Sequence, residues 1–469
     1  MYRKKTKIVA TVGPVTANEK TMTELVKAGM NVVRINFSHG DFAEHEPKVH
    51  LARKISQKLN KPIAILQDLG GPKIRIGDFG VESVILKPGA IFTLTTEKVV
   101  GDDQHVSINY PLLPKEVKIG GQILLHDGKK KLEIIDIKGK AVICKVIVGG
   151  EIKSRRGVNL PGAYLSISSI TDKDRKDLEF GLKHKVDYIA LSFVRRPSDI
   201  IELRSILQKN KSTAGIIAKI ETPEALENID EIINLADGIM VARGDLAIEI
   251  PAEEVPLVQK ELIKKCNRAG KPVITATQML ESMIKSPVPT RAEVSDVANA
   301  ILDGTDAIML SEETTLGDYP VESVKMMNAI ACRVERELLH RANQFKEFNH
   351  SVAGVVSRAV VQAASEVGAK VIVALTNTGH TARMISRYRP KESVIALTPN
   401  QVAVGRMMLS YGCYPMNIKK FKTLNEVLSL IRSLVLTNKL ANKGDKVVVV
   451  AGMPFGHSID TNMLLVEEI

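Results

Sequence analysis

The sequence predicts an α/β protein with three parts: a (β/α)8 TIM barrel, a small all-β domain inserted into it, and a C-terminal open α/β domain. Three observations predict this fold. Apolar runs of strand length alternate with amphipathic helical stretches over the first 340 residues. One connection among them is too long for a loop. The last ~125 residues carry a second alternation of the same kind.

Eight apolar runs predict the barrel strands, because runs that are hydrophobic on both faces are typical of parallel strands covered by helices. They are Lys7–Gly13, Val32–Ser38, Ile63–Leu69, Tyr188–Val194, Gly215–Glu221, Gly238–Gly244, Pro272–Gln278 and Ala307–Glu312. Helical periodicity lies between or after most of them. It covers Glu19–Ala28, Glu46–Leu59, Asp172–His184, Asp199–Gln208, Glu224–Leu235, Val255–Arg268, Arg291–Leu302 and Val321–Leu338.

The long connection begins after Leu69 and predicts the inserted domain. Glycine-rich turn signals recur through it and separate short β-branched runs such as Ile91–Thr96 and Lys140–Val148. This pattern is typical of a small all-β domain. We therefore assign 1–69 and 159–340 to the barrel and 70–158 to the inserted domain.

Residues 341–469 predict the open α/β domain. Its expected strands are Lys370–Thr376, Ser393–Thr398, Cys413–Ile418 and Lys446–Ala451. Its expected helices are Val352–Val367, Thr381–Tyr388, Val402–Ser410 and Leu424–Leu436.

The composition argues against several classes of function. The net charge of +12 is spread along the chain, aromatic residues make up 4% and tryptophan is absent, so we expect no nucleic-acid partner. Charge of this kind favours small acidic ligands or a solvated surface. No apolar run is long enough for a membrane span, and the N-terminus lacks the pattern of a signal peptide. The four cysteines are scattered, which favours a cytoplasmic protein without disulfides or zinc.

Charged pairs end two adjacent strand candidates. Lys219 and Glu221 project from one face of the fifth strand, because side chains alternate along a strand. Arg243 and Asp245 show the same spacing after the sixth. Buried charges need a partner, a metal or a charged substrate. The pattern therefore predicts either a site for a phosphorylated, metal-bound ligand or two structural ion pairs.

Polar residues also end other predicted strands, and the carboxyl ends of barrel strands form one opening. They are Arg34, Asn36 and Ser38 on the second strand, Asp68 on the third, Thr275 and Thr277 on the seventh, and Ser311, Glu312, Glu313 and Thr314 after the eighth. Convergence of so many polar groups favours a functional site over isolated ion pairs.

Residue types suggest the chemistry. The carboxylates of Glu221 and Asp245 are hard oxygen ligands suited to Mg²⁺ or Mn²⁺. Arg34 and Lys219 can neutralise a phosphoryl group. Thr277 can orient a water or relay a proton. The chain contains neither a Walker motif nor a strand–GxGxxG–helix unit, so a bound nucleotide would be held in another way.

Five segments together resemble pyruvate kinase, in order and over essentially the whole chain. They are Val33–Gly40 (VRINFSHG), Asp68–Arg75 (DLGGPKIR), Ile217–Glu221 (IAKIE), Ala242–Leu246 (ARGDL) and Thr277–Met283 (TQMLESM). The resemblance implies the glycolytic transfer of phosphate from phosphoenolpyruvate to ADP, giving pyruvate and ATP, with Mg²⁺ in a cytoplasmic homotetramer. It also implies that the inserted domain is a lid.

The resemblance assigns roles to individual residues. Lys219, Thr277 and Arg34 would be catalytic, and Glu221 and Asp245 would hold the metal. The substrate would contact Arg34, Lys219, Arg243, Gly244, Asp245 and Thr277, and the nucleotide would contact Asn36, His39 and Arg75. A loop with Thr376, Thr378, Gly379 and Thr381, near a second loop at Gly452–Thr461, would bind a sugar-phosphate or nucleotide effector. Asp460 adds a negative charge there, so loss of regulation is the alternative.

One departure from the family pattern concerns a monovalent cation. Many family members bind K⁺ through residues that match Asn36, Ser38, Asp68 and a threonine, but this chain has Leu69 in the threonine's place. It also has Lys73 where those members carry a glutamate. An ammonium is a fixed monovalent cation. We therefore expect Lys73 to replace K⁺, so that the enzyme needs no potassium.

Two other functions compete with this interpretation. A metal-dependent lyase or aldolase acting on pyruvate-like substrates would explain the carboxylates, but not the inserted domain. A basic scaffold that binds nucleic acid would explain the charge, but not the polar strand ends.

Overall fold

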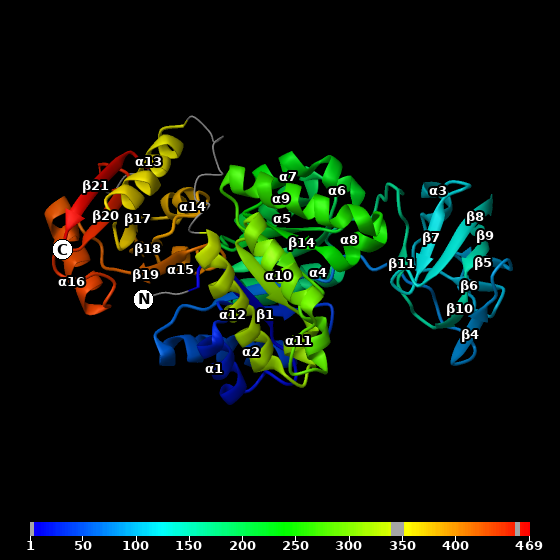
Figure 1. Ribbon diagram of the computed structural model, residues 1–469. Coiled ribbons are helices and arrows are strands. Elements are labelled where there is room, and N and C mark those ends of the chain that lie inside the picture. The colour runs from blue at the N-terminus through cyan, green and yellow to red at the C-terminus, as the bar shows by residue number, and fades with distance from the viewer. Residues whose placement is uncertain (1–3, 339–350, 455–459) are drawn as a thin grey trace.

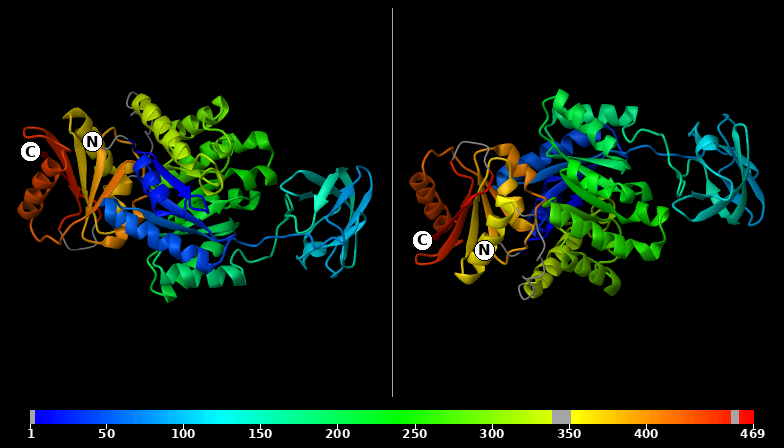
Figure 2. Two further views of the ribbon diagram at one scale, coloured as in Figure 1. Left: turned by 90° about the horizontal axis from the view of Figure 1, so that it is seen from below. Right: turned by 90° about the horizontal axis from the view of Figure 1, so that it is seen from above.

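The structure is a computed structural model that describes residues 4–338, 351–454 and 460–469. Three bodies follow one another along its length, as Figure 1 shows: the C-terminal domain at one end, the barrel in the middle and the all-β domain at the other end. The views from below and above in Figure 2 show the same order. None of the helices in the described residues is long and apolar enough to cross a bilayer.

Eight parallel strands close into a barrel in the order β1-β16-β15-β14-β13-β12-β3-β2. They are β1 (Lys7–Thr11), β2 (Val32–Asn36), β3 (Ala64–Asp68), β12 (Tyr188–Val194), β13 (Gly215–Ile220), β14 (Gly238–Ala242), β15 (Val273–Ala276) and β16 (Ala307–Leu310). All eight predicted strands are confirmed. Most end one or two residues earlier than predicted, because the polar ends turn toward helices or loops.

Helices surround the barrel. They are α1 (Glu19–Ala28), α2 (Phe42–Leu59), α4 (Asp172–Lys183), α5 (Pro197–Lys209), α6 (Pro223–Glu227), α7 (Ile229–Leu235), α8 (Arg243–Glu249), α9 (Val255–Ala269), α10 (Arg291–Asp303), α11 (Glu312–Thr315) and α12 (Pro320–Leu338). Side-chain caps begin several of them, such as Thr171 and Asp174 in a capping box at α4. The single helix predicted over 224–235 is wrong. It is two helices, because the Asn228 side-chain amide bonds the carbonyls of Arg195 and Glu224 where the helix breaks.

The inserted domain leaves the barrel after β3 and returns before α4. It contains β4 (Ser83–Leu86), β5 (Ile91–Thr95), β6 (His105–Ser107), α3 (Leu113–Glu116), β7 (Gln122–Leu125), β8 (Lys130–Lys138), β9 (Ala141–Val148), β10 (Gly150–Lys153) and β11 (Val158–Asn159). Six of these strands form one sheet, and β10 pairs with β4 in a second. The domain has a hydrophobic core of its own. The prediction of a separate all-β domain is confirmed.

The C-terminal domain is an open five-stranded sheet in the order β19-β18-β17-β20-β21. Its elements are α13 (Val352–Glu366), β17 (Val371–Leu375), α14 (His380–Ser386), β18 (Ser393–Thr398), α15 (Gln401–Arg406), β19 (Cys413–Asn417), α16 (Leu424–Thr437), β20 (Lys446–Ala451) and β21 (Met463–Glu468). The edge strand β21 pairs antiparallel with β20 and was not predicted. Its four apolar residues, of which three are half-buried and one is exposed, precede two acidic ones and give too weak a pattern to predict a strand.

The C-terminal domain packs against the barrel. Met408 and Leu409, which follow α15, belong to the same buried cluster as the inward-facing residues of the barrel strands. Arg389 bonds Asp306 at 3.1 Å across the contact. The hydroxyl of Tyr188 on β12 donates to the carbonyl of Arg406 at 2.5 Å. The two domains therefore share part of one hydrophobic core.

Lys7 on β1 is buried at this contact, and its ammonium bonds the carbonyl of Cys413 and lies 4.5 Å from the ring centre of Tyr414. Burial lowers the pKa of Lys7 to about 8, although nearby negative groups oppose the shift. Between pH 8 and the ordinary lysine pKa, the unfolded chain binds more protons at this residue than the folded one, so stability rises with pH.

We therefore expect the free energy of unfolding of the wild type to rise, relative to that of Lys7→Met, by up to about 3 kcal/mol between pH 8 and pH 10.5. Urea titrations of both proteins at the two pH values measure the difference. If the difference in free energy of unfolding between the two proteins stayed constant with pH, burial would not have lowered the pKa of Lys7.

Candidate active site

A buried lysine joins three polar groups at the carboxyl ends of the barrel strands. Lys219 on β13 has its Nζ 3.3 Å from Asp68 Oδ1 and 3.0 Å from Glu221 Oε1. The same nitrogen donates to Ser192 Oγ at 2.6 Å. Asp68 and Glu221 are each 1% exposed. The structure therefore brings together the predicted residues of strands three and five.

Arg34 on β2 extends this cluster. Its Nε donates to Asp68 Oδ2 at 2.6 Å, and a terminal nitrogen donates to Thr11 Oγ1 at 2.8 Å. Charges thus alternate in the order Arg34, Asp68, Lys219, Glu221. Burial would raise the pKa of Asp68, but the two cations outweigh it and hold that pKa below its ordinary value. The two cations are therefore anchored on carboxylates.

The neighbouring charges keep Lys219 protonated, whereas the pKa of Glu221 lies close to neutral pH. Burial would lower the pKa of Lys219, yet Asp68, Glu221 and Asp245 raise it instead. Burial, together with the nearby charge of Asp245, raises the pKa of Glu221 to about 7 even though Lys219 opposes this. Glu221 Oε2 accepts from the amide of Phe193 at 2.7 Å, and Oε1 faces the Lys219 ammonium at 3.0 Å.

This arrangement fits a divalent cation. The Glu221 carboxylate is buried, and the Lys219 ammonium beside it is shared with Asp68. The neighbouring Asp245 is partly exposed and supplies a second carboxylate. Two carboxylates are the donor type that Mg²⁺ and Mn²⁺ take. Glu221 and Asp245 are therefore residues that could hold such an ion.

The predicted face-sharing of Arg243 and Asp245 is wrong, because both lie in the first turn of helix α8 and not on a strand. The guanidinium of Arg243 pairs with Asp296 at 2.6 Å and bonds the carbonyl of Thr277 at 2.7 Å. It is therefore held away from Lys219 by these contacts. The backbone that follows it, at Gly244, stays at the site.

Thr277 fixes that backbone. Its hydroxyl accepts from the amide of Gly244 at 2.8 Å and donates to the carbonyl of Ala276 at 2.6 Å. Its φ of +67° lies in the left-handed region, which is strained for a β-branched residue. Such strain persists where the surrounding structure imposes it, and it clusters at functional sites. Thr277 thus lies beside Gly244, the residue that precedes Asp245.

A cavity of about 630 Å³ opens between the barrel and the all-β domain. Its lining includes His39, Lys73, Arg75, Asp245 and Glu312. Positive and negative groups therefore face each other across it. Phe193 and Thr222 also line the cavity. Thr222 follows Glu221 in the chain, and the amide of Phe193 donates to the Glu221 carboxylate.

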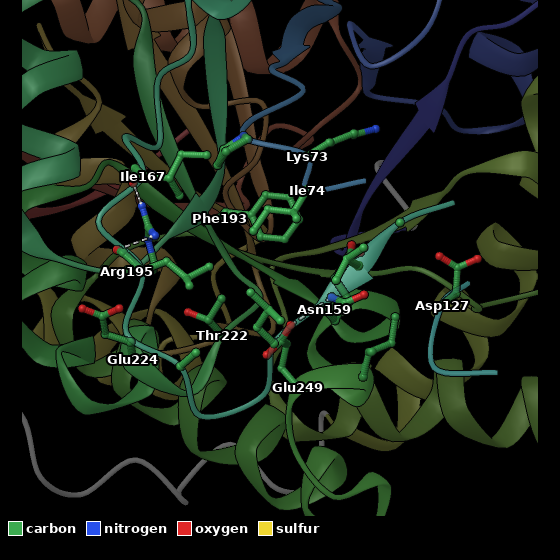
Figure 3. Close-up of a pocket in the computed structure, with 18 of the residues that line it drawn as sticks. Lys73, Ile74, Asp127, Asn159, Ile167, Phe193, Arg195, Thr222, Glu224 and Glu249 are labelled. Atoms are coloured by element: carbon green, nitrogen blue, oxygen red, sulfur yellow. Dashed lines mark hydrogen bonds between the residues drawn. The ribbon is translucent and has the colours of Figure 1, made fainter. Parts of the chain in front are cut away.

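The close-up in Figure 3 shows how the rim of this cavity is tied to the barrel. Arg195 bonds the carbonyl of Ile167, and Asn159 donates to Glu249 at 2.9 Å. Sequence reasoning missed these residues, and it also missed Ser192. The period of two along β12 places Ser192 in line with Ala190 and Tyr188, but a lone serine in an apolar run gives no signal of its partner Lys219.

Some predicted polar residues serve the scaffold instead. Thr275 is fully buried and bonds Thr305 at 2.9 Å. Glu313 accepts from the amides of Leu280 and Ser311, and Thr314 donates to the carbonyl of Thr11. Glu312 lines the cavity, and it is the only described residue after β16 that does so.

Some of the residues expected around a monovalent cation form hydrogen bonds within the protein. Asn36 Oδ1 accepts from the amide of Ser38 at 3.0 Å. Leu69 is fully buried, and its carbonyl accepts from Ser192 at 2.7 Å. Burial lowers the pKa of Lys73, whereas the charges of Asp245 and Asp68 act to raise it. The Lys73 ammonium therefore interacts electrostatically with the carboxylates of Asp245 and Asp68.

The loop expected to bind an effector turns into α14. Thr376 Oγ1 accepts from the amide of Gly379 at 3.0 Å, and Thr381 bonds Thr461 at 2.9 Å. The Gly379 φ of +85° suits glycine, and an added Cβ would lie 2.7 Å from Met407. His380 N approaches Thr378 Oγ1 at 3.4 Å. Residues 455–459 of the second loop lie outside the described residues, and an effector stays a prediction.

Comparison with known proteins matches both halves of this architecture. Residues 3–324 match the family described as "Pyruvate kinase, barrel domain", and residues 355–467 match "Pyruvate kinase, alpha/beta domain". The chain belongs to the pyruvate kinase family. The predicted resemblance and the three-part fold are thereby confirmed, and the protein is a phosphotransferase.

Individual relatives are similar over essentially the whole of this chain. A pyruvate kinase of Clostridium acetobutylicum is 46% identical over 99% of both chains. One of Geobacillus stearothermophilus is 44% identical over 100% of this chain and 81% of its own. A crystal structure of a pyruvate kinase from Cryptosporidium parvum superimposes with a TM-score of 0.94 at 37% identity, over 99% of this chain and 96% of that one.

Proposed function

We propose that this member of the pyruvate kinase family transfers the phosphoryl group of phosphoenolpyruvate to ADP in glycolysis, with Mg²⁺ or Mn²⁺ and without K⁺. The observation that carries the proposal is the buried series Arg34, Asp68, Lys219, Glu221, which lies beside Asp245. Phosphoryl transfer is catalysed mainly by positioning and by charge stabilisation, and this series supplies both.

The cations of the series would act on the phosphoryl group. Lys219 stays protonated because three carboxylates favour its charge, so its ammonium can stabilise the transferring group and the enolate that remains. Arg34 would bind phosphate oxygens from the opposite side of Asp68. Glu221 and Asp245 would hold the divalent ion, which when bound neutralises oxygens of the substrate. The roles of Lys219 and Arg34 require them to be anchored, and Asp68 anchors both.

The substrate's carboxylate and its methylene carbon would meet α8 and Thr277. The backbone of Arg243 and Gly244 would lie beside the carboxylate, where the first turn of α8 favours negative charge. Thr277 Oγ1, now bonded to Gly244 and Ala276, would assist protonation of the enolate. The fixed position of that hydroxyl supports this role.

The nucleotide would lie in the cavity beneath the all-β domain. His39 and Arg75 line it, and Asn36 lies at the end of β2 nearby. We propose that the domain 70–158 acts as a lid between barrel segments 1–69 and 159–340, with 341–469 as the third domain. Closing such a lid would exclude water from the reacting groups.

We also propose that the enzyme works in the cytoplasm as a homotetramer. The four cysteines form no disulfide, which suits a reducing compartment. A sugar phosphate or a nucleotide would be the effector at Thr376, Thr378, Gly379 and Thr381. Light scattering measures the assembly, and a panel of both ligand classes in the activity assay tests regulation.

The proposal is tested by a coupled assay of pyruvate formation from phosphoenolpyruvate and ADP with Mg²⁺. Turnover that needs ADP and yields stoichiometric ATP is expected. Cleavage of a pyruvate-like substrate without ADP would instead indicate the metal-dependent lyase. Salt-sensitive binding to DNA without turnover would indicate the nucleic-acid scaffold.

Lys73 gives a prediction about potassium. The wild type is expected to reach full activity in buffer free of Na⁺ and K⁺, because the ammonium of Lys73 supplies the monovalent charge. Lys73→Glu reverses that charge, and we expect it to become activated by K⁺ about tenfold or more, equivalent to ~1.4 kcal/mol. Rates with and without added KCl give the measurement.

Lys118→Glu is the matched control, because it makes the same charge change at an exposed site elsewhere in the all-β domain. It should stay indifferent to K⁺. A wild type that K⁺ activates strongly would show that Lys73 does not replace the ion.

A further inference from the structure

Two histidines and a glutamate meet on the outer surface of the barrel, away from the site described above. Glu46 and His50 lie one turn apart on α2, and His184 caps the C-terminus of α4. Glu46 Oε1 is 3.3 Å from His184 Nε2 and 3.7 Å from His50 Nε2. All three donor atoms lie within 4.8 Å of one another.

This spacing matches metal ligation. Tetrahedral donors at about 2.0–2.2 Å from a zinc ion lie roughly 3.4 Å apart, close to the two distances observed. The donors i and i+4 on α2 share one face of that helix. Two imidazoles and a carboxylate form a donor set that zinc takes in proteins. Nitrogen donors also favour such a metal over Mg²⁺, which prefers oxygen.

A second observation points to a ligand. The His184 side chain is 6% exposed, and its Nε2 is buried without a hydrogen bond from any described residue. An imidazole nitrogen that faces a carboxylate and has no hydrogen bond lacks compensation for its burial. The ring is fixed, since it packs on Phe180 with centroids 4.2 Å apart and meets the His50 ring edge-on at 5.6 Å.

A lysine also contacts the carboxylate of this cluster, through Glu46 Oε1. Lys183 Nζ lies 3.3 Å from the same Oε1 and competes with a metal for that oxygen.

We propose that Glu46, His50 and His184 form a site for a divalent transition metal of the zinc type, which joins α2 to α4. His184 follows the C-terminus of α4, whereas Glu46 and His50 lie in the first half of α2, so the site lies on the outer flank between these two helices. None of its three residues lines the active-site cavity, so we assign the metal a structural role. A metal bound only by the folded protein raises its stability.

The experiment is a calorimetric titration of the full-length protein with ZnCl₂ in excess Mg²⁺, which occupies the all-oxygen site of Glu221 and Asp245. Wild type is expected to bind one equivalent that His50→Ala loses or binds at least about 100-fold more weakly, since changes outside the ligand shell already cost ~10–100-fold. His50 is exposed, so this variant should fold. Zinc should raise the melting temperature of the wild type but not that of His50→Ala.

Two further variants sharpen the result. His105→Ala removes another exposed histidine paired with a carboxylate, Asp102, and should bind zinc like the wild type. Lys183→Gln frees Glu46 from the competing ammonium and should bind zinc more tightly. Co²⁺ in place of zinc should give a visible absorption band that His50→Ala lacks. Equal zinc affinity of wild type and His50→Ala would overturn the proposal, as would the absence of binding to the wild type.

Discussion

Lys219→Met is expected to lower kcat for pyruvate formation at least about 1,000-fold, because the variant loses the charge that, in the proposed function, stabilises the transferring phosphoryl group. Methionine fills a similar volume without a charge. The coupled assay at saturating phosphoenolpyruvate, ADP and Mg²⁺ measures the loss. A folded variant with a rate within tenfold of the wild type would show that the ammonium is not needed for transfer.

Stability must be followed in the same variant. Removing Lys219 leaves the buried carboxylates of Asp68 and Glu221 with less compensation, which can cost about 3–5 kcal/mol. Rates are therefore taken well below the melting temperature, with circular dichroism as the check of folding. Ser192→Ala is the matched control, since it removes a hydrogen bond of the same nitrogen but keeps the charge.

Glu221→Gln is expected to raise the Mg²⁺ concentration needed for half-maximal activity and to lower kcat/KM about 100-fold. Glutamine keeps the shape of the side chain and an oxygen for the amide of Phe193, but loses the charge that would hold the ion. Mn²⁺ binding followed by electron paramagnetic resonance reports the affinity independently of turnover.

Glu249→Gln is the comparison variant for the metal prediction. Glu249 lines the same cavity and bonds Asn159, but it is not one of the proposed metal ligands, Glu221 and Asp245. Its Mg²⁺ requirement should match that of the wild type. If Glu221→Gln also kept the wild-type requirement, the ion would have to be held elsewhere.

The sequence was sufficient for the fold where periodicity was long and unambiguous. All eight barrel strands and the all-β insertion follow from hydrophobic runs and turn signals. The meeting of Lys219 with Asp68 also follows, because the carboxyl ends of barrel strands share one rim. These features depend on local pattern and on the closure of the sheet.

The features that could not be predicted lie where regular secondary structure ends or depend on residues far apart in the chain. The period of two holds only inside a strand, so it misplaced Arg243, which begins a helix one residue after β14 ends. Ser192 gave no signal, because its importance comes from a lysine 27 positions away. The strained backbone of Thr277 was equally invisible, since only surrounding contacts impose a positive φ.

The shared packing of Met408 and Leu409 with the inward-facing barrel residues has a thermodynamic consequence. The C-terminal domain closes the floor of the barrel, so unfolding of either one would expose the apolar residues of this shared cluster. The all-β domain keeps its own apolar centre and has only two covalent links to the rest. Heating should therefore give two cooperative units, one small and one large, in place of three.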